Sequence, residues 1–384
     1  MITTEAWLLD RGPKQGTEPG ELRRGSFSFP DITPHEILAE PLYGCWEANM
    51  THALKRFPVD VCRLRCEEQV VLGNSGIVRV LETGGEVSTV EPGDICMLAP
   101  FGELDGYGYM MRVFGYDAPN TIGLLARKIK LQEKQVVPIP KDTRHDLRRW
   151  AGASVRYATA RDNWGVAYGC FRLQVSEDED PTPFVWSWGG GVGLGELILA
   201  KRQGCRVAMI SSMDERLRLI EENGITPIDR REFPNLQFDA ERFESDREYR
   251  RTYLDSERRF LVTVRSKTEG RRVSIFIDNI GGPVLRPTLK ALARQGVLTT
   301  AGWDRGSQLT FDRITECTRR HIHVHTHGAR YAGARATVTY AEETDWLPPV
   351  EEEVWDWDHI PELARSFAAG EITTYFPIFR VNDV

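Results

Sequence analysis

The chain lacks the cysteine patterns of a disulfide-stabilised domain or a zinc-binding lobe. Its seven cysteines are scattered, their number is odd, and no two of them form a CxxC pair. The closest two are Cys62 and Cys66, and we treat a metal site at this pair as the less favoured interpretation. An odd, irregular set does not resemble a disulfide framework, and it favours a reducing, cytoplasmic setting.

Long apolar runs and a surplus of basic charge are also absent. No run of 18 apolar residues occurs, and the first residues, MITTEAWLLDRGPKQ, do not combine a basic region with an apolar one. The sequence therefore predicts neither a membrane-spanning helix nor a secretory signal. The 49 basic and 56 acidic residues give a net charge of −7. That balance argues against a nucleic-acid-binding protein, which normally carries a basic surface.

What the sequence does contain is two stretches of different character. The first 150 of the 384 residues are β-rich, as in SGIVRVLETGGEVSTVEPGD, where a strand, a turn at Gly84-Gly85 and a returning strand through Val87 and Val90 are expected. After Trp150, strands and helices alternate, with a helix expected over VLRPTLKALARQ. This alternation predicts a doubly wound parallel sheet. We expect domains at residues 1–150 and 151–330, with the tail 331–384 returning to the first.

A glycine-rich turn joins a strand to a helix in the second stretch. Within SWGGGVGLGE, glycine occupies five of the seven positions from Gly189 to Gly195. A diphosphate needs backbone N–H donors and close approach, which glycine allows, and a helix N-terminus favours its charge. The strict GxGxxG spacing is absent, and a tight turn without a ligand is the alternative. The predicted binding residues are Trp188, Gly189, Gly190, Gly191, Val192 and Gly193.

The end of the next strand bears on the choice of dinucleotide. That strand ends in Ile210-Ser211-Ser212, where a site for NAD usually carries Asp or Glu to bind the ribose hydroxyls. Ser211, Ser212 and the following Arg216 instead suit a 2′-phosphate. We therefore expect NADPH rather than NADH, although Arg216 also fits an ordinary solvated helix position.

The segment HIHVHTH, residues 321–327, holds four of the eight histidines. On a strand all four would share one face, about 7 Å apart, which is wide for two ligands of one metal ion. A structural or interface role for His321, His323 and His325 is favoured over a metal site. His327 comes last, at the carboxyl end of the strand, where open α/β sheets bind their ligands.

These segments, in this order, resemble the medium-chain dehydrogenase/reductase superfamily. GNSGIVRVLETGGEVSTVEPGD is similar to its signature for a GroES-like β domain, and VWSWGGGVGLGE and FIDNIGGPVLRPTLKALARQGVLTTAG are similar to segments of its Rossmann-type domain. The resemblance implies that Asn279 and Gly302 lie at the cofactor site. Zinc members carry Gly-His-Glu where this chain has Gly73-Asn74-Ser75, and their first zinc cysteine and a nearby Asp fall on Trp46 and Asn49. The resemblance therefore implies a zinc-free enzyme.

Two segments narrow the resemblance to enoyl-thioester reductases of the crotonyl-CoA carboxylase/reductase type. They are VAMISSMDERLRLIEENGITPIDRREF and THGARY, which contains His327. The implied reaction is hydride transfer from NADPH to the β-carbon of an α,β-unsaturated thioester, with or without carboxylation, in a homodimer. The candidate catalytic residues are His327, Tyr43, Glu47, Asn49 and Asn74. Two alternatives stay open: a quinone or enone reductase acting on a free small molecule, and a relative that binds nucleotide or a partner protein without redox turnover.

Overall fold

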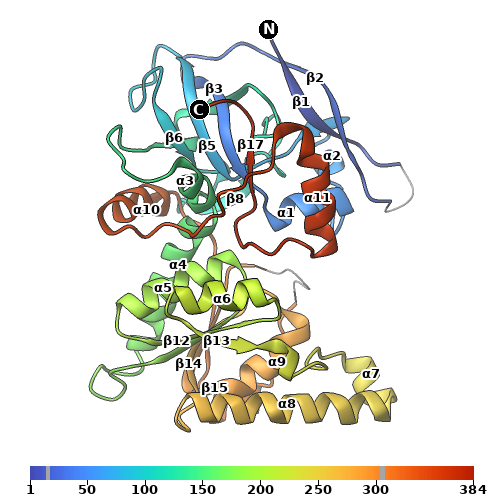
Figure 1. Ribbon diagram of the computed structural model, residues 1–384, viewed down its shortest axis with the longest axis vertical. Helices are drawn as coiled ribbons and strands as arrows, with labels where there is room; N and C mark the ends of the chain where they lie inside the picture. Colours follow the sequence, from blue (N-terminus) through green and yellow to red (C-terminus); the bar gives the residue numbers. More distant parts are fainter. Residues whose placement is uncertain (14–17, 303–307) are drawn as a thin grey trace. The chain divides into compact units, whose positions relative to one another are not determined.

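The computed structural model describes residues 1–13, 18–302 and 308–384. The chain divides into two compact units (Figure 1). Unit 1 comprises Met1–Ala158 and Ala329–Val384, and unit 2 comprises Thr159–Gly328. The division falls inside helix α4 (Arg156–Arg172), so this one helix begins in unit 1 and continues in unit 2. Among the described residues, no helix is both long enough and apolar enough to cross a lipid bilayer.

Unit 1 is built mainly of antiparallel strands. Its strands are β1 (Ile2–Asp10), β2 (Leu22–Phe29), β3 (Glu36–Cys45), β4 (Gln69–Val71), β5 (Gly76–Thr83), β6 (Ile95–Leu98), β7 (Phe101–Leu104), β8 (Met110–Val113), β9 (Ile129–Gln132), β10 (Val136–Pro138) and β17 (Ile378–Arg380). Its helices are α1 (Ala48–Lys55), α2 (Val61–Leu64), α3 (Leu147–Ala153), α10 (Tyr331–Thr344) and α11 (Ile360–Ala369), with short turns η1 (Glu133–Gln135) and η4 (Trp357–His359).

The central sheet of unit 1 has the strand order β10-β6-β5-β3-β17, and β9 also pairs with β3. Apolar side chains of β5 such as Ile77 and Val78 are fully buried in the core. The tail contributes β17, which pairs antiparallel with the end of β3. The predicted returning strand through Val87 and Val90 is wrong, because both residues lie in the loop between β5 and β6 and belong to no strand. They still pack against the core, which explains their apolar character.

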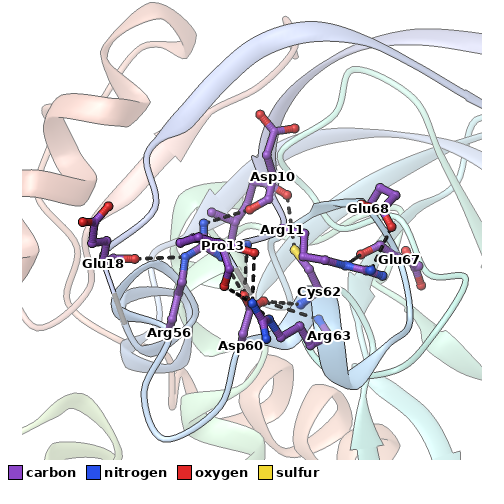
Figure 2. A network of polar contacts seen from close by, with 12 residues as sticks. Asp10, Arg11, Pro13, Glu18, Arg56, Asp60, Cys62, Arg63, Glu67 and Glu68 are labelled. Atoms are coloured by element: carbon purple, nitrogen blue, oxygen red, sulfur yellow. Dashed lines mark hydrogen bonds and ion pairs between the residues drawn. The ribbon is translucent and has the colours of Figure 1, made fainter. Parts of the chain in front are cut away.

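A polar network holds the loop after β1 against the segment that joins α1 to α2 (Figure 2). The Arg56 guanidinium pairs with Asp60 at 3.1 Å, and the other contacts of Asp60 include the backbone N–H of Gly12 at 3.0 Å. Cys62 is buried here and its thiol donates to the carbonyl of Leu9, whereas Cys66 is exposed. Burial raises the pKa of the Cys62 thiol to about 11. These contacts give Cys62 a structural role.

Unit 2 is a six-stranded parallel sheet flanked by helices, which confirms the predicted doubly wound architecture (Figure 1). The strand order is β13-β12-β11-β14-β15-β16. Its strands are β11 (Phe184–Trp188), β12 (Arg206–Ser211), β13 (Thr226–Asp229), β14 (Val273–Ile277), β15 (Leu292–Thr300) and β16 (His323–Thr326). Its helices are the rest of α4, α5 (Gly191–Arg202), α6 (Asp214–Glu222), α7 (Ala240–Ser245), α8 (Arg247–Lys267) and α9 (Gly282–Ala291), with the turn η2 (Arg230–Glu232) and the π-helical η3 (Arg313–Arg319).

Two details of unit 2 differ from the sequence prediction. Helix α9 ends at Ala291, so the last residues of the expected helix belong instead to β15, which begins at Leu292 beside Val273 of β14. The histidine strand is also shorter than expected. His321 has a left-handed backbone with φ 54° and precedes β16, so it does not continue the face that His323 and His325 share.

Candidate active site

The glycine turn of unit 2 leaves the N-terminus of α5 open. Gly190 is the N-cap residue with φ 98° and ψ 152°, a conformation that glycine adopts without strain, and no side chain caps the helix. A Cβ built on Gly190 would meet no atom of the described residues within 4 Å, so these residues leave space at this position. Gly193 serves packing instead, because its Cβ would lie 2.2 Å from Ser187 Oγ. Uncapped N–H groups and open space suit an anion such as a diphosphate.

The side chain of Trp188 belongs to the core rather than to this turn. It is buried, stacks on Phe260 at 5.3 Å between ring centroids, and its indole N–H donates to Thr288 Oγ1 at 2.7 Å. The Thr288 hydroxyl also lies 3.1 Å from Asp278, whose other oxygen accepts the N–H of Gly281. Burial raises the pKa of Asp278 to about 6. Trp188 thus fixes the end of β11, and only its main chain borders the turn.

The carboxyl end of β12 holds the residues predicted to select the dinucleotide. Ser211 is buried as the last residue of β12, Ser212 is exposed, and Arg216 is half-buried on α6. The parallel register pairs Ser211 with Asp229, the last residue of β13. Arg230 therefore follows directly beside Ser211 and Ser212. No acidic residue follows Ser211 at positions 212 or 213, so this part of the site can accept a phosphate.

Two arginines that sequence reasoning missed follow β13. Arg231 makes ion pairs with Asp229 at 2.7 Å and Asp214 at 2.5 Å, which hold its guanidinium in place. The guanidinium of Arg230 lies 5.7 Å from the ring centroid of Trp188. The signal was present as IDRR, two basic residues directly after a buried strand. The pattern alone does not assign a role to Arg230, because only the parallel register of β12 and β13 brings it next to Ser211.

Asn279 and Gly302 lie at the carboxyl ends of the neighbouring strands β14 and β15. Asn279 Oδ1 accepts the backbone N–H of Ala301 at 2.7 Å, and a Cβ built on Gly302 would lie 3.4 Å from the Asn279 Cβ. Parallel strands present their carboxyl ends at one edge of the sheet. The structure therefore brings both residues to the same edge as the glycine turn.

His327 follows β16 at this same edge. Its backbone N–H donates to the carbonyl of Thr300, and its Nε2 lies 3.6 Å from Asp162 Oδ2 on α4. Both side chains are buried, with 3% and 10% of their surface exposed. The rings of His325 and His327 have centroids 5.9 Å apart. Across the described residues, no three His, Cys, Asp or Glu side chains gather where they could hold a metal ion.

In unit 1 a buried polar cluster lies where β3 ends and β5 begins. The register pairs Gly44 with Gly76, which brings the residues after Cys45 next to those before β5. Arg156 reaches the cluster from α4: Nη1 donates to Cys45 Sγ at 2.7 Å, and Nη2 lies 3.2 Å from Glu47 Oε2. We call Cys45, Glu47, Asn49, Asn74, Ser75 and Arg156 the β3–β5 cluster. It contains three of the predicted catalytic residues.

The electrostatics of the β3–β5 cluster are unusual. Burial raises the pKa of Glu47, and the Arg156 guanidinium acts in the opposite direction. Burial also raises the pKa of the Cys45 thiol to about 12, so the thiol is neutral. A side-chain hydrogen bond from Ser75 also acts to lower the pKa of Glu47. In the described part of this cluster, two buried side-chain oxygens make no hydrogen bond, Asn49 Oδ1 and Asn74 Oδ1. Buried acceptors without a partner are costly, so this cluster is suited to a polar ligand or to water.

Two further predicted positions have simpler environments. Trp46 is fully buried in the core of unit 1, and its indole N–H donates to Thr51 Oγ1 at 3.0 Å. Tyr43 is half-buried on β3, opposite Ile77 and Arg380 in the sheet. Sequence reasoning missed Arg156, although an arginine between the small and apolar residues of AGASVRYA is a detectable irregularity.

A separate cavity of about 330 Å³ lies at the amino ends of the strands of unit 2 and is lined by Phe184, Trp186, Lys201, Cys205, Arg206, Val207, Ala208, Gly224, Thr226 and Lys267. Lys201 lies in the last turn of α5 and donates to the carbonyl of Asn223, while Lys267 ends α8. Cations at helix C-termini are explained by the helix dipole. Their presence therefore does not require a ligand.

Comparison with known proteins identifies the fold. No family model matches the chain, and neither does any curated protein sequence. Solved structures do match over nearly the whole chain. The crotonyl-CoA carboxylase/reductase AntE in complex with NADP has a TM-score of 0.78 at 20% identity, covering 100% of this chain and 95% of that one.

Two further solved structures illustrate how broad this likeness is. The 2-octenoyl-CoA carboxylase reductase CinF in complex with NADP and 2-octenoyl-CoA gives a TM-score of 0.78 at 19% identity, covering 99% of this chain and 88% of that one. An alcohol dehydrogenase from Aeropyrum pernix gives 0.74 at 19% identity, covering 98% of this chain and 99% of that one. The chain therefore has the GroES-like plus Rossmann-type fold of medium-chain dehydrogenases and reductases.

Proposed function

We propose that this protein is a zinc-free, NADPH-dependent reductase that adds hydride to the β-carbon of an α,β-unsaturated thioester. The observation that carries the proposal is the N-terminus of α5 at Gly190, where no described side chain caps the helix and a Cβ on Gly190 would meet no described atom within 4 Å. A dinucleotide diphosphate fits this arrangement. Solved structures with this fold bind NADP, and one of them also binds 2-octenoyl-CoA.

The dinucleotide is proposed to be NADPH because the end of β12 carries hydroxyls and nearby arginines. Ser211 and Ser212 replace the acidic residue that would bind a ribose diol, and Arg216 and Arg230 supply positive charge. Arg231 pairs with Asp214 and Asp229, and these carboxylates offset its charge. We expect NADPH to bind at least 10-fold more tightly than NADH.

Bound NADPH would supply the hydride, and the protein must stabilise the negative charge that then develops on the substrate. Hydride addition to an enoyl thioester leaves an enolate, which needs hydrogen-bond donors at its oxygen and a proton at its α-carbon. In unit 2, His327 beside Asp162 is a candidate donor. In unit 1, Glu47, Asn49 and Asn74 are candidates because a protonated carboxyl group or a side-chain amide N–H can donate a hydrogen bond. Tyr43 remains a candidate from the sequence resemblance.

The test combines binding with turnover. Tryptophan fluorescence is titrated with NADPH and then with NADH, and NADPH oxidation is followed at 340 nm with crotonyl-CoA and 2-octenoyl-CoA, each with and without bicarbonate. A free enone and a benzoquinone serve as competing substrate classes. Reduction of only the free compounds would favour a quinone or enone reductase. Binding without any turnover would favour a nucleotide-binding relative, and absence of NADPH binding would remove the basis of the proposal.

A homodimer is also proposed. Strand β16 is the edge strand of the parallel sheet, so its outer backbone N–H and C=O groups can pair with a second copy. Light scattering after size-exclusion chromatography measures the mass directly. A mass of one chain at micromolar concentration would contradict this proposal.

A further inference from the structure

The guanidinium of Arg156 is buried against mostly neutral acceptors. It donates to Cys45 Sγ and to the carbonyl of Trp46, both at 2.7 Å. Among the described residues, Glu47 is its only ion-pair partner, at 3.2 Å through Oε2. The aromatic ring of Phe376 lies 5.6 Å below the guanidinium. In the described part of the chain, the positive charge of Arg156 is therefore paired with a single carboxyl group.

The Glu47 carboxyl group also forms a side-chain hydrogen bond with Ser75, which acts to lower its pKa. Among the described residues of the β3–β5 cluster, the buried oxygens of Asn49 and Asn74 make no hydrogen bond. A hard cation would accept such oxygens as ligands. The guanidinium on the same carboxyl group repels a cation, so a polar organic ligand or water fits better.

We propose that Glu47 is the acid that protonates the α-carbon of the enolate, and that Arg156 is a positioning residue that orients Glu47 and stabilises its carboxylate afterwards. This inference rests on the proposed function. In the step, the O–H bond of Glu47 breaks and its electron pair stays on the carboxylate oxygen. The electron pair of the enolate C=C bond forms the new C–H bond, and the thioester C=O is restored. Solvent returns a proton to Glu47 before the next turnover.

The charges of the β3–β5 cluster favour this sequence. While Glu47 is protonated, Arg156 leaves the cluster with a net positive charge, which stabilises an enolate nearby. After proton transfer, Glu47 and Arg156 form a neutral ion pair. Burial raises the pKa of Glu47 and so favours its protonated form, whereas Arg156 acts to lower that pKa. A general acid must hold a proton and then release it, and these two opposing influences act on that property of Glu47.

The test uses Glu47→Gln, which keeps the shape and removes the proton, with Arg156→Met and Arg156→Lys. The buried, ion-paired Glu257 of unit 2 gives a matched control, Glu257→Gln. Measured quantities are the Kd of NADPH, kcat, and deuterium at the product α-carbon after turnover in D₂O. We expect Glu47→Gln to keep the Kd of NADPH, to lose about 100-fold in kcat, and to place deuterium on both faces. The control should keep wild-type values.

The pH profile separates positioning from a purely structural role. Because Glu47 acts as an acid, kcat falls as pH rises through its pKa, and Arg156 lowers that pKa. Arg156→Met should therefore move the fall in kcat to higher pH and also lower the maximal kcat. Arg156→Lys should partly restore the pH dependence and the maximal kcat. Suppose that the wild-type protein turns over, that the kcat of Glu47→Gln stays within about 3-fold of the wild-type value, and that deuterium enters one face of the α-carbon only. The inference about Glu47 is then wrong and the proposed function stands. If wild type reduces no enoyl thioester, both are wrong.

Discussion

A single methyl group on Gly190 should separate nucleotide binding from folding. Gly190 has φ 98° and ψ 152°, a region that costs other residues about 1–3 kcal/mol, and a Cβ there meets no neighbouring atom. The stability cost of Gly190→Ala is therefore backbone strain alone. The same Cβ occupies the space through which a diphosphate reaches the N–H groups of α5. Losing one or two charge-assisted hydrogen bonds there, at about 1.5–3 kcal/mol each, weakens binding about 100-fold.

Gly204 provides a matched control for this prediction. It follows the other end of α5 with φ 83°, and a Cβ there also meets nothing within 4 Å. Gly204→Ala should lower the Tm by a comparable amount and leave the Kd of NADPH unchanged. Both variants are compared by thermal unfolding and by tryptophan fluorescence titration with NADPH. The reasoning is refuted if the Gly190→Ala protein binds NADPH within about 3-fold of the Gly204→Ala protein.

Three further predictions concern the packing of unit 2. Burial raises the pKa of Glu196 from 4.5 to about 8. Between these pH values the native state therefore binds more protons than the unfolded chain. The free energy of unfolding should fall as pH rises, by up to about 1.4 kcal/mol per pH unit. Urea unfolding of Glu196→Gln between pH 5 and 9 should lack this fall, and an unchanged slope would disprove the assignment. Gly193→Ala should lower the free energy of unfolding by about 1–3 kcal/mol, because the added Cβ would lie 2.2 Å from Ser187 Oγ. Adding Ser187→Ala should recover part of that loss. No recovery would mean that the clash is not the cause. Trp188→Phe removes the donor to Thr288 and should lower the unfolding free energy by about 1 kcal/mol, so an unaltered value in urea would argue against this hydrogen bond.

Much of the fold could be predicted because it depends on patterns within short segments. The apolar run around Met209 and Ile210 marks a buried parallel strand, and the glycines from Gly189 to Gly195 mark the turn into α5. Local errors occurred where a segment's own preference competes with distant partners. Val87 and Val90 suit a strand, yet they lie in the loop between β5 and β6 and pack against the core from there.

The sequence by itself determined the alternation of strands and helices, the glycine turn and the absence of an acidic residue directly after Ser211. Tertiary structure alone decided which polar groups meet. Arg156 and Asp162 lie on one helix, α4, but the first reaches Glu47 and the second reaches His327. Backbone geometry and apolar burial follow from neighbours along the chain. A buried polar group instead takes partners that strand register and helix packing bring from distant positions, and no local pattern records them.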